Sequence, residues 1–188
     1  ADTQVLIDSP KVPLISATGS ERMCEQIAPR VAARFGRAIL ELGGNNAAIV
    51  TPSADLDLAV RGIVFAAAGT AGQRCTTMRR VIVHDSIADE LVSRLVQVYT
   101  RLPIGDPFAD GTLVGPLIDG RAYTTMATAL DNAEQQGGTV VVGGGRRTSS
   151  ENSYYVQPAI VRMPAQTEVV KQETFAPILY VLTYSTIE

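Results

Sequence analysis

Apolar and polar positions along the chain follow two spacings, and each spacing predicts a different kind of element. In four segments apolar residues recur every three or four positions, which is typical of amphipathic helices. These helices are predicted at about 21–35, 54–68, 86–102 and 119–136. Short apolar runs between turns predict strands at 12–17, 38–42, 47–50, 80–83, 139–142, 159–162 and 178–183. Strands alternating with helices of this length favour an α/β fold with a mostly parallel sheet.

Capping residues set the expected ends of these helices. Ser20 is predicted to begin the first helix, and Pro29 inside it predicts an interruption, because proline has no N–H to donate. Ser53 is predicted to cap the second helix, and Ser86 with Asp89 resembles a capping box that opens the third. Each of these caps requires that a side-chain oxygen accept a hydrogen bond from a backbone N–H in the first turn of its helix.

Charge and hydropathy exclude several kinds of partner. The 188 residues carry 16 Lys and Arg against 19 Asp and Glu, a formal net charge of -3. No nucleic-acid partner is expected, because the chain has no basic excess to neutralise a phosphate backbone. The central apolar run from Ile63 to Ala68 is far shorter than the roughly 20 residues that span a membrane. No membrane partner is expected, and the opening residues lack the pattern of a secretory signal.

Cysteine and histidine usage narrows the chemistry further. Cys24 and Cys75 are widely separated and do not form a disulfide framework, which indicates a reducing compartment and a cytoplasmic location. His84 is the only histidine of the sequence, so a zinc site built from several His and Cys is excluded and no metal is expected. Any chemistry therefore depends on a cysteine, on carboxylates or on a bound cofactor.

Two residues have settings that favour catalysis. Cys75 lies between Arg74 and two threonines in a Gly-rich loop, which is typical of an accessible nucleophile, although a packed small residue is the alternative. Glu41 interrupts an apolar run just before Gly43. Its carboxylate is expected at the C-terminal end of a strand, where open α/β sheets bind ligands and where partial burial suits a general base. A Glu41 on the solvent face of an alternating strand is the alternative.

Four ordered motifs resemble the aldehyde dehydrogenase superfamily. The matching segments are Ala17-Thr18-Gly19-Ser20, Leu40-Glu41-Leu42-Gly43-Gly44-Asn45-Asn46, Gly69-Thr70-Ala71-Gly72-Gln73-Arg74-Cys75-Thr76-Thr77 and Gln172-Glu173-Thr174-Phe175-Ala176-Pro177. The 34 positions between Glu41 and Cys75 are also similar to the family's spacing of base and nucleophile. The double Asn and the strings around Cys75 and Phe175 most resemble the branch that oxidises α-aminoadipic semialdehyde, in equilibrium with piperideine-6-carboxylate.

The resemblance implies a fold and a domain organisation. It implies a three-layer α/β catalytic domain of aldehyde dehydrogenase type over 36–188, incomplete at its C-terminal end. Residues 1–35 would then be the C-terminal remnant of an NAD-binding domain. Members of the family are much longer, so this chain alone is expected to show negligible turnover, and the full-length protein is expected to be a homo-oligomer, a dimer or a tetramer.

The resemblance also implies a reaction. The Cys75 thiolate would add to an aldehyde, and the resulting thiohemiacetal would be oxidised to a thioester with NAD, or NADP, as acceptor. Glu41 would activate the water that releases the carboxylic acid, and the Cys75 backbone N–H would stabilise the tetrahedral oxyanion.

Cofactor contacts are implied at both ends of the chain. Glu173 would hydrogen-bond the nicotinamide ribose, and Phe175 would pack beside the cofactor, with simple core packing as its alternative. The turn before the first helix would meet the pyrophosphate through free N–H groups, the Gly19 backbone among them. The implied cofactor residues of this N-terminal part are Thr18, Gly19, Ser20 and Gly43.

The role of Arg74 and the function of the chain each have an alternative interpretation. Arg74 would pair with a carboxylate at the far end of an acidic semialdehyde, or it would hold the loop. The rival classes are a non-catalytic binding module and a cysteine esterase that needs no NAD, because a reactive thiol with a water-activating carboxylate turns over activated esters on its own.

Overall fold

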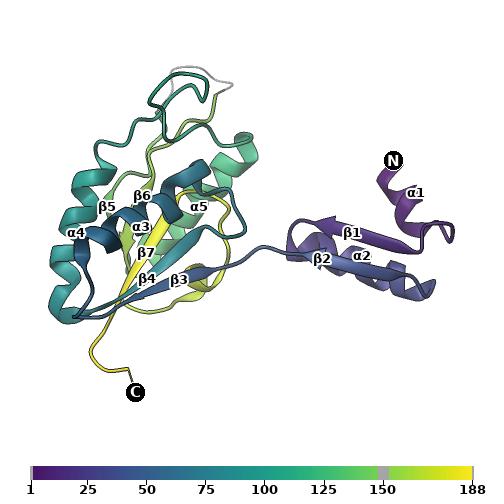
Figure 1. The fold of residues 1–188 in the computed structure, drawn as a ribbon, viewed down its shortest axis with the longest axis horizontal. Helices are drawn as coiled ribbons and strands as arrows, with labels where there is room; N and C mark the ends of the chain where they lie inside the picture. Colours follow the sequence, from purple (N-terminus) through teal and green to yellow (C-terminus); the bar gives the residue numbers. More distant parts are fainter. Residues whose placement is uncertain (1, 148–152, 188) are drawn as a thin grey trace. The chain divides into compact units, whose positions relative to one another are not determined.

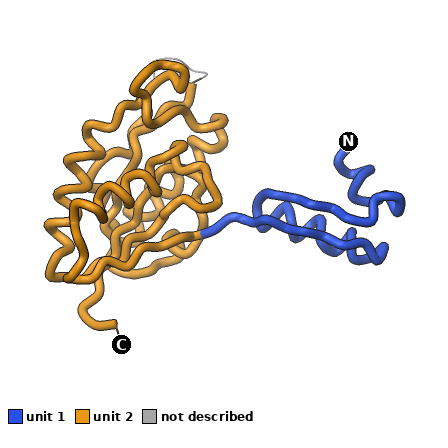
Figure 2. Tube along the Cα trace, in the orientation of Figure 1, with its two compact units in different colours: residues 1–44 blue, residues 45–188 orange. Residues whose placement is uncertain are grey.

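Two compact units make up the chain. The computed structural model describes residues 2–147 and 153–187, which divide into the units Ala1–Gly44 and Asn45–Glu188 (Figure 2). The first unit extends to Gly44 because strand β2 (Arg37–Glu41) pairs with strand β1 (Leu14–Thr18) inside it, while the domain boundary after residue 35 stays a prediction. The assignment of the N-terminal part to an NAD-binding domain stays a prediction.

The first unit is a two-stranded parallel sheet with two helices (Figure 1). Its helices are α1 (Asp2–Asp8), which the sequence did not predict, and α2 (Glu21–Ala33). Ile7, Ile27 and Val31 form its buried apolar cluster. The β1–β2 register sets Thr18 opposite Glu41, so the carboxyl ends of both strands lie side by side.

Helix α2 runs without a break through Pro29, so the predicted interruption is wrong. The Ser20 side chain accepts a bond from Met23 N at 3.3 Å and begins the helix as predicted. Proline removes one backbone hydrogen bond, while Ile27 and Val31 on either side of it are buried. Burial of this apolar face outweighs the single lost bond.

The second unit is a five-stranded sheet covered by helices (Figure 1). Its strand order is β3-β4-β7-β6-β5, and only the β5–β6 pair is antiparallel, which confirms a mostly parallel sheet. The elements are β3 (Asn46–Val50), α3 (Leu56–Ala68), the 3₁₀ helix η1 (Gly69–Gly72), β4 (Met78–His84), α4 (Asp85–Tyr99), α5 (Gly120–Gln135), β5 (Thr139–Val142), β6 (Ala159–Arg162), α6 (Glu168–Lys171) and β7 (Ile178–Tyr184).

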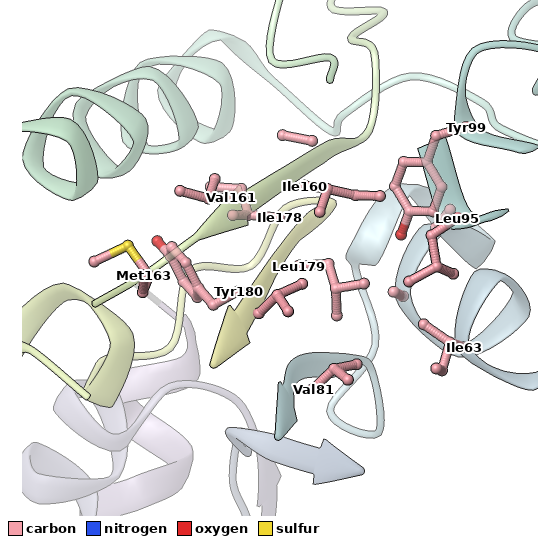
Figure 3. Close-up of a cluster of buried hydrophobic side chains, with 14 of the residues drawn as sticks. Ile63, Val81, Leu95, Tyr99, Ile160, Val161, Met163, Ile178, Leu179 and Tyr180 are labelled. Carbon is pink, nitrogen blue, oxygen red and sulfur yellow. The ribbon is translucent and has the colours of Figure 1, made fainter. Parts of the chain in front are cut away.

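Apolar side chains from both faces of this sheet form the core of the second unit. Figure 3 shows Leu179 directed toward Ile63 of α3 and Leu95 of α4, whereas Val161 and Tyr180 are directed toward the opposite side. All five side chains are buried. Helices α3 and α4 therefore cover one face and α5 and α6 the other, which confirms the predicted three-layer α/β arrangement.

Two helix caps differ from the predicted ones. Asp55, not Ser53, begins α3 by accepting bonds from the backbone N–H groups of the first turn at 3.0 and 3.1 Å. His84, not Ser86, begins α4, because its Nδ1 accepts a bond from Ser86 N at 3.2 Å.

Over the described residues, no helix combines the length and the apolar composition that crossing a membrane requires.

Candidate active site

Cys75 lies on a short turn between η1 and β4, and the turn's backbone is held from two sides. Cys75 is exposed and so is not packed in the core of the second unit, while its role as the nucleophile stays a prediction. The Asn46 side chain donates from Nδ2 to the carbonyl oxygens of Cys75 and Thr77, at 2.8 and 3.0 Å. The Thr77 hydroxyl in turn accepts from Arg74 N at 3.1 Å. The thiol is thus accessible, while the main chain that carries it is fixed.

The turn before Cys75 depends on a glycine. Thr70, Ala71 and Gly72 all have left-handed backbone conformations, with φ of 55°, 51° and 67°. A Cβ on Gly72 would lie 2.4 Å from the carbonyl carbon and oxygen of Ala176 and 2.5 Å from Pro177 N. Only glycine allows so close an approach. The loop of Cys75 therefore packs directly on the segment that follows Glu173.

Arg79 joins the same two segments through one guanidinium group. On the side of the nucleophile it donates to Gly72 O at 3.3 Å and to Arg74 O at 3.2 Å. On the other side it donates to Thr174 O at 2.6 Å, to Ala176 O at 3.4 Å and to a Glu173 carboxylate oxygen at 3.1 Å. The Arg79 side chain is 2% exposed, so these acceptors take the place of water.

The sequence analysis missed Arg79, although the pattern of β4 contains a signal for it. Residues 79, 81 and 83 are the buried positions of this strand, and Val81 and Val83 occupy the other two. An arginine in the inward phase of a strand must find charged or carbonyl partners. Burial lowers the pKa of the Arg79 guanidinium, and the Glu173 carboxylate opposes this shift by stabilising the charged form.

Glu173 lies at the edge of a cavity in the second unit, and Phe175 follows it two positions later. The cavity has a volume of about 280 Å³ and is bounded by Glu173 and by the threonines Thr124, Thr125 and Thr128 of α5. This volume is just below the roughly 300–1,000 Å³ of small-molecule sites, so it suits part of a larger ligand. Phe175 is 45% exposed. The guanidinium carbon of Arg79 lies over the Phe175 ring, 5.4 Å from the ring centre. The ring is therefore not packed in the core of the second unit, and its place beside a cofactor stays a prediction.

Arg74 is directed back onto α3. Its guanidinium donates to Phe65 O at 3.0 Å and lies 5.1 Å from the centre of the Phe65 ring. These contacts are the ones expected of a residue that holds the loop, the alternative that the sequence left open. A pairing of Arg74 with a substrate carboxylate stays a prediction.

Two further amides position the site, and the sequence analysis assigned a role to neither. Gln73 donates to Pro116 O at 3.2 Å and accepts from Ile118 N at 2.9 Å, which ties the loop of Cys75 to the segment before α5. Asn45 donates to Val170 O at 2.8 Å and to Lys171 O at 2.9 Å. The α6 segment that leads to Glu173 is thereby fixed to the start of β3.

The remaining predicted residues belong to the first unit. Glu41 is the last residue of β2, as expected, but it is exposed, so the partial burial expected of its carboxylate is not found in this unit. The expectation of a free Gly19 N–H is wrong, because this group donates to Glu41 O at 3.0 Å. Thr18 and Ser20 flank Gly19, and Gly43 follows β2 in the connecting segment. The pairing of Glu41 with Cys75 of the second unit stays a prediction.

Comparisons with known proteins point to one family. The chain matches the aldehyde dehydrogenase family over residues 2–188. It is 43% identical over 178 residues to aldehyde dehydrogenase family 7 member A1 of Malus domestica, covering 95% of this chain and 35% of that protein. It is 46% identical over 175 residues to α-aminoadipic semialdehyde dehydrogenase of Bos taurus, covering 93% and 32%. The chain thus spans about a third of the length of these relatives.

A solved structure matches the fold as well. The crystal structure of betaine aldehyde dehydrogenase from Staphylococcus aureus, in complex with NAD+, superposes with a TM-score of 0.93 at 27% identity. The match covers 98% of this chain and 37% of the solved chain.

Proposed function

The chain belongs to the aldehyde dehydrogenase family, and on this premise we propose that it is the catalytic-domain portion of an enzyme that oxidises an aldehyde to a carboxylic acid. One observation carries the proposal. The exposed Cys75 thiol lies on a turn that packs, through Gly72, on the Glu173–Pro177 segment beside a cavity. The proposed nucleophile and the proposed cofactor-binding carboxylate thus lie on two segments that pack directly on each other.

The proposed reaction begins at sulfur. The Cys75 thiolate adds to the carbonyl carbon, and the negative charge that develops on oxygen is stabilised by the Cys75 backbone N–H. A bound nicotinamide supplies the acceptor for the hydride that leaves this carbon. The thioester that remains on Cys75 is attacked by water, and Glu41 takes the proton from that water. The carboxylic acid leaves and the thiolate is restored.

The residues of the second unit fit a nicotinamide cofactor, NAD or NADP. Glu173 borders the cavity with a carboxylate, which accepts hydrogen bonds from the two hydroxyls of a ribose. Phe175, two positions after Glu173, offers an exposed ring for an aromatic or apolar part of the cofactor. In the first unit, Thr18, Ser20 and Gly43 are proposed to line the pyrophosphate side, while the Gly19 N–H is already bonded to Glu41 O.

The proposed substrate is an acidic semialdehyde, of which α-aminoadipic semialdehyde is the named example. The support is the 46% identity to the bovine enzyme that carries this name. Arg74, next to the nucleophile, would bind the distal carboxylate, which requires that its guanidinium release Phe65 O. Substitution Arg74→Ala is then expected to raise KM for acidic aldehydes more than for neutral ones.

The organisation of the whole protein follows from the same premise. We propose that the N-terminal unit contains the end of an NAD-binding domain, and that the full-length protein is a cytoplasmic homo-oligomer, a dimer or a tetramer. The 188-residue chain by itself is expected to show negligible dehydrogenase turnover, because it spans about a third of its relatives' length.

The test uses a chimaera in which this chain replaces the matching third of the bovine relative, with NADH formation as the readout. Substitution Cys75→Ser is expected to abolish turnover, and Glu41→Gln to slow it by about 10²–10⁴-fold. Turnover that survives Cys75→Ser would overturn the proposal. The same assay with Arg74→Ala, on matched acidic and neutral aldehydes, tests the substrate class. An equal rise in KM for both aldehydes would show that Arg74 does not bind a substrate carboxylate.

A separate outcome would favour the esterase. If the unmodified 188-residue chain hydrolyses activated esters without NAD, and Cys75→Ser abolishes this, a cysteine hydrolase becomes the better reading. If the chimaera shows no dehydrogenase activity and the 188-residue chain shows no esterase activity, the remaining alternative is a non-catalytic binding module.

A further inference from the structure

Arg79 contacts both halves of the site in the second unit. We propose that Arg79 is a positioning residue that couples the Glu173 carboxylate to the Cys75 turn, so that the reactivity of the thiol depends on the state of Glu173. This inference rests on the proposed function, because it assigns the two residues to one reaction. It extends that function by naming the group that sets their relative placement.

The acceptors named above for Arg79 divide between the two segments. Gly72 O and Arg74 O belong to the loop that carries Cys75. The other acceptors belong to residues 173–176, and one of them is the Glu173 carboxylate itself. Because the guanidinium is planar and rigid, movement of one segment changes the hydrogen bonds available to the other.

Charge reinforces this geometric link. The Arg79 side chain is 2% exposed and that of Glu173 is 26% exposed, so the cation is screened far less by solvent than a surface arginine would be. The Glu173 carboxylate partly neutralises it at 3.1 Å. Without the Glu173 charge, the guanidinium loses one of its acceptors, and its hydrogen bonds to Gly72 O and Arg74 O on the loop of Cys75 change with it. The carboxylate that is proposed to bind ribose therefore also adjusts the nucleophile.

The experiment is a double-mutant cycle on the 188-residue chain. The readout is the rate of Cys75 alkylation by iodoacetamide as a function of pH, measured by peptide mass spectrometry. Cys24, which is 3% exposed and lies in the other unit, serves as an internal reference in the same sample. The variants are Arg79→Met, Glu173→Gln and the double substitution, with Arg79→Lys as the conservative change.

Coupling predicts a specific pattern of rates. Arg79→Met is expected to slow Cys75 alkylation near neutral pH by about fivefold, because Gly72 O and Arg74 O of its loop lose their donor, and Glu173→Gln to speed it by about threefold. In the Arg79→Met background, Glu173→Gln is expected to have no effect. Arg79→Lys keeps the positive charge but not the planar guanidinium that donates to several acceptors at once. Its Cys75 alkylation rate should therefore lie between those of Arg79→Met and wild type. A residue that only stabilises the fold would lower the melting temperature and leave this pattern absent.

Matched controls come from ion pairs elsewhere in the second unit. Arg162→Lys and Asp89→Asn alter a pair at 2.7 Å whose side chains are 41% and 92% exposed, and both are expected to leave Cys75 alkylation unchanged. Independent effects of Arg79→Met and Glu173→Gln, or an Arg79→Met rate equal to wild type, would overturn the proposal.

A second comparison applies if Arg79→Met does not fold. Glu173→Gln is then set against Glu168→Gln, which removes a carboxylate paired with Lys171 on the surface of α6. A rate change with Glu173→Gln alone supports the coupling, and equal rates for the two variants overturn it. None of these readouts needs a cofactor or an aldehyde, so failure of the dehydrogenase assay and failure of this inference are distinguishable.

Discussion

The candidate residues of the two units lie at opposite ends of their strands. In the first unit, Thr18 and Glu41 are the last residues of the parallel strands β1 and β2. In the second unit, Cys75 precedes β4 and Glu173 precedes β7, so both lie at the amino ends of parallel strands. The turn after β1 leads at once into α2, whereas the second unit brings together loops that are distant in sequence.

The two ends are held by different kinds of contact. At the carboxyl ends of β1 and β2, backbone pairing and the Ser20 cap fix the geometry, with Gly19 N bonded to Glu41 O. At the amino ends, side chains bridge separate loops, above all those of Asn46 and Arg79. The comparison teaches that local backbone structure presents the first set of residues, while long-range side-chain contacts present the second.

The largest expected effect is at Gly72. Substitution Gly72→Ala forces a side chain into a left-handed position and against the Ala176 backbone, and should destabilise the second unit by about 3 kcal/mol. Urea unfolding followed by far-UV circular dichroism measures this. The matched control is Gly62→Ala in α3, where a Cβ meets nothing within 4 Å and a gain of about 0.5–1 kcal/mol is expected. Equal behaviour of the two variants would show that the close approach is absent.

A smaller loss is expected at Asn46. Substitution Asn46→Ala removes the bonds to Cys75 O and Thr77 O, and each is worth about 1 kcal/mol or less at this exposed position. The same urea titration should show a loss of about 1–2 kcal/mol. The neighbouring exposed Thr76→Ala should change little. If the two substitutions were indistinguishable, side-chain bridging of this turn would be refuted.

The corresponding change in the first unit is Ser20→Ala. Loss of the cap should destabilise α2 by about 1 kcal/mol, whereas Ser20→Asp keeps an acceptor and a favourable charge at the helix start. Hydrogen exchange of the amides in the first turn of α2 reports the effect locally. Faster exchange in the second unit as well would contradict the separation of the two units.

The smallest expected effect depends on pH. Arg30 lowers the pKa of Asp8 below its ordinary value through a side-chain hydrogen bond at 3.0 Å. A depressed carboxyl pKa stabilises the fold at neutral pH, and this stabilisation is lost as pH falls below about 3.9 and through the lowered pKa. Asp8→Asn should therefore be slightly less stable than wild type at pH 7 and equal to it in acid. A difference that persists in acid would assign the effect to packing.

Regular segments of the fold were predictable because their signals are local. The strands Thr139–Val142 and Ala159–Arg162 begin and end where the apolar runs do. Helix α2 shows the limit of such reasoning, since burial of Ile27 and Val31 overrides the proline between them. The caps of α3 and α4 differ because Asp55 and His84 lie directly before the first turn, where their acceptors reach the backbone.

The candidate site was predictable only in part. Cys75 and Glu41 have distinctive neighbours in sequence, and the structure shows Cys75 exposed and Glu41 at a strand end. Arg79 was missed because several of its partners, the Glu173 carboxylate among them, lie more than 90 positions along the chain, and no local pattern predicts them. Its place in the inward phase of β4, beside Val81, is the signal that alternation alone contains.

The partners of Arg79 also determine when the Cys75 turn can be linked to the Glu173 segment during synthesis. Three of them lie 94, 95 and 97 positions after it. Until residues 173–176 emerge, a growing chain offers this guanidinium the nearby Gly72 O and Arg74 O but not these three acceptors. Contacts at such separation require closure of a long loop, and they form late in folding. Cys75 is translated about a hundred residues earlier, together with Asn46, whose side chain already holds the Cys75 turn. The order of the sequence thus makes the link between this turn and the Glu173 segment one of the last features of the second unit to form.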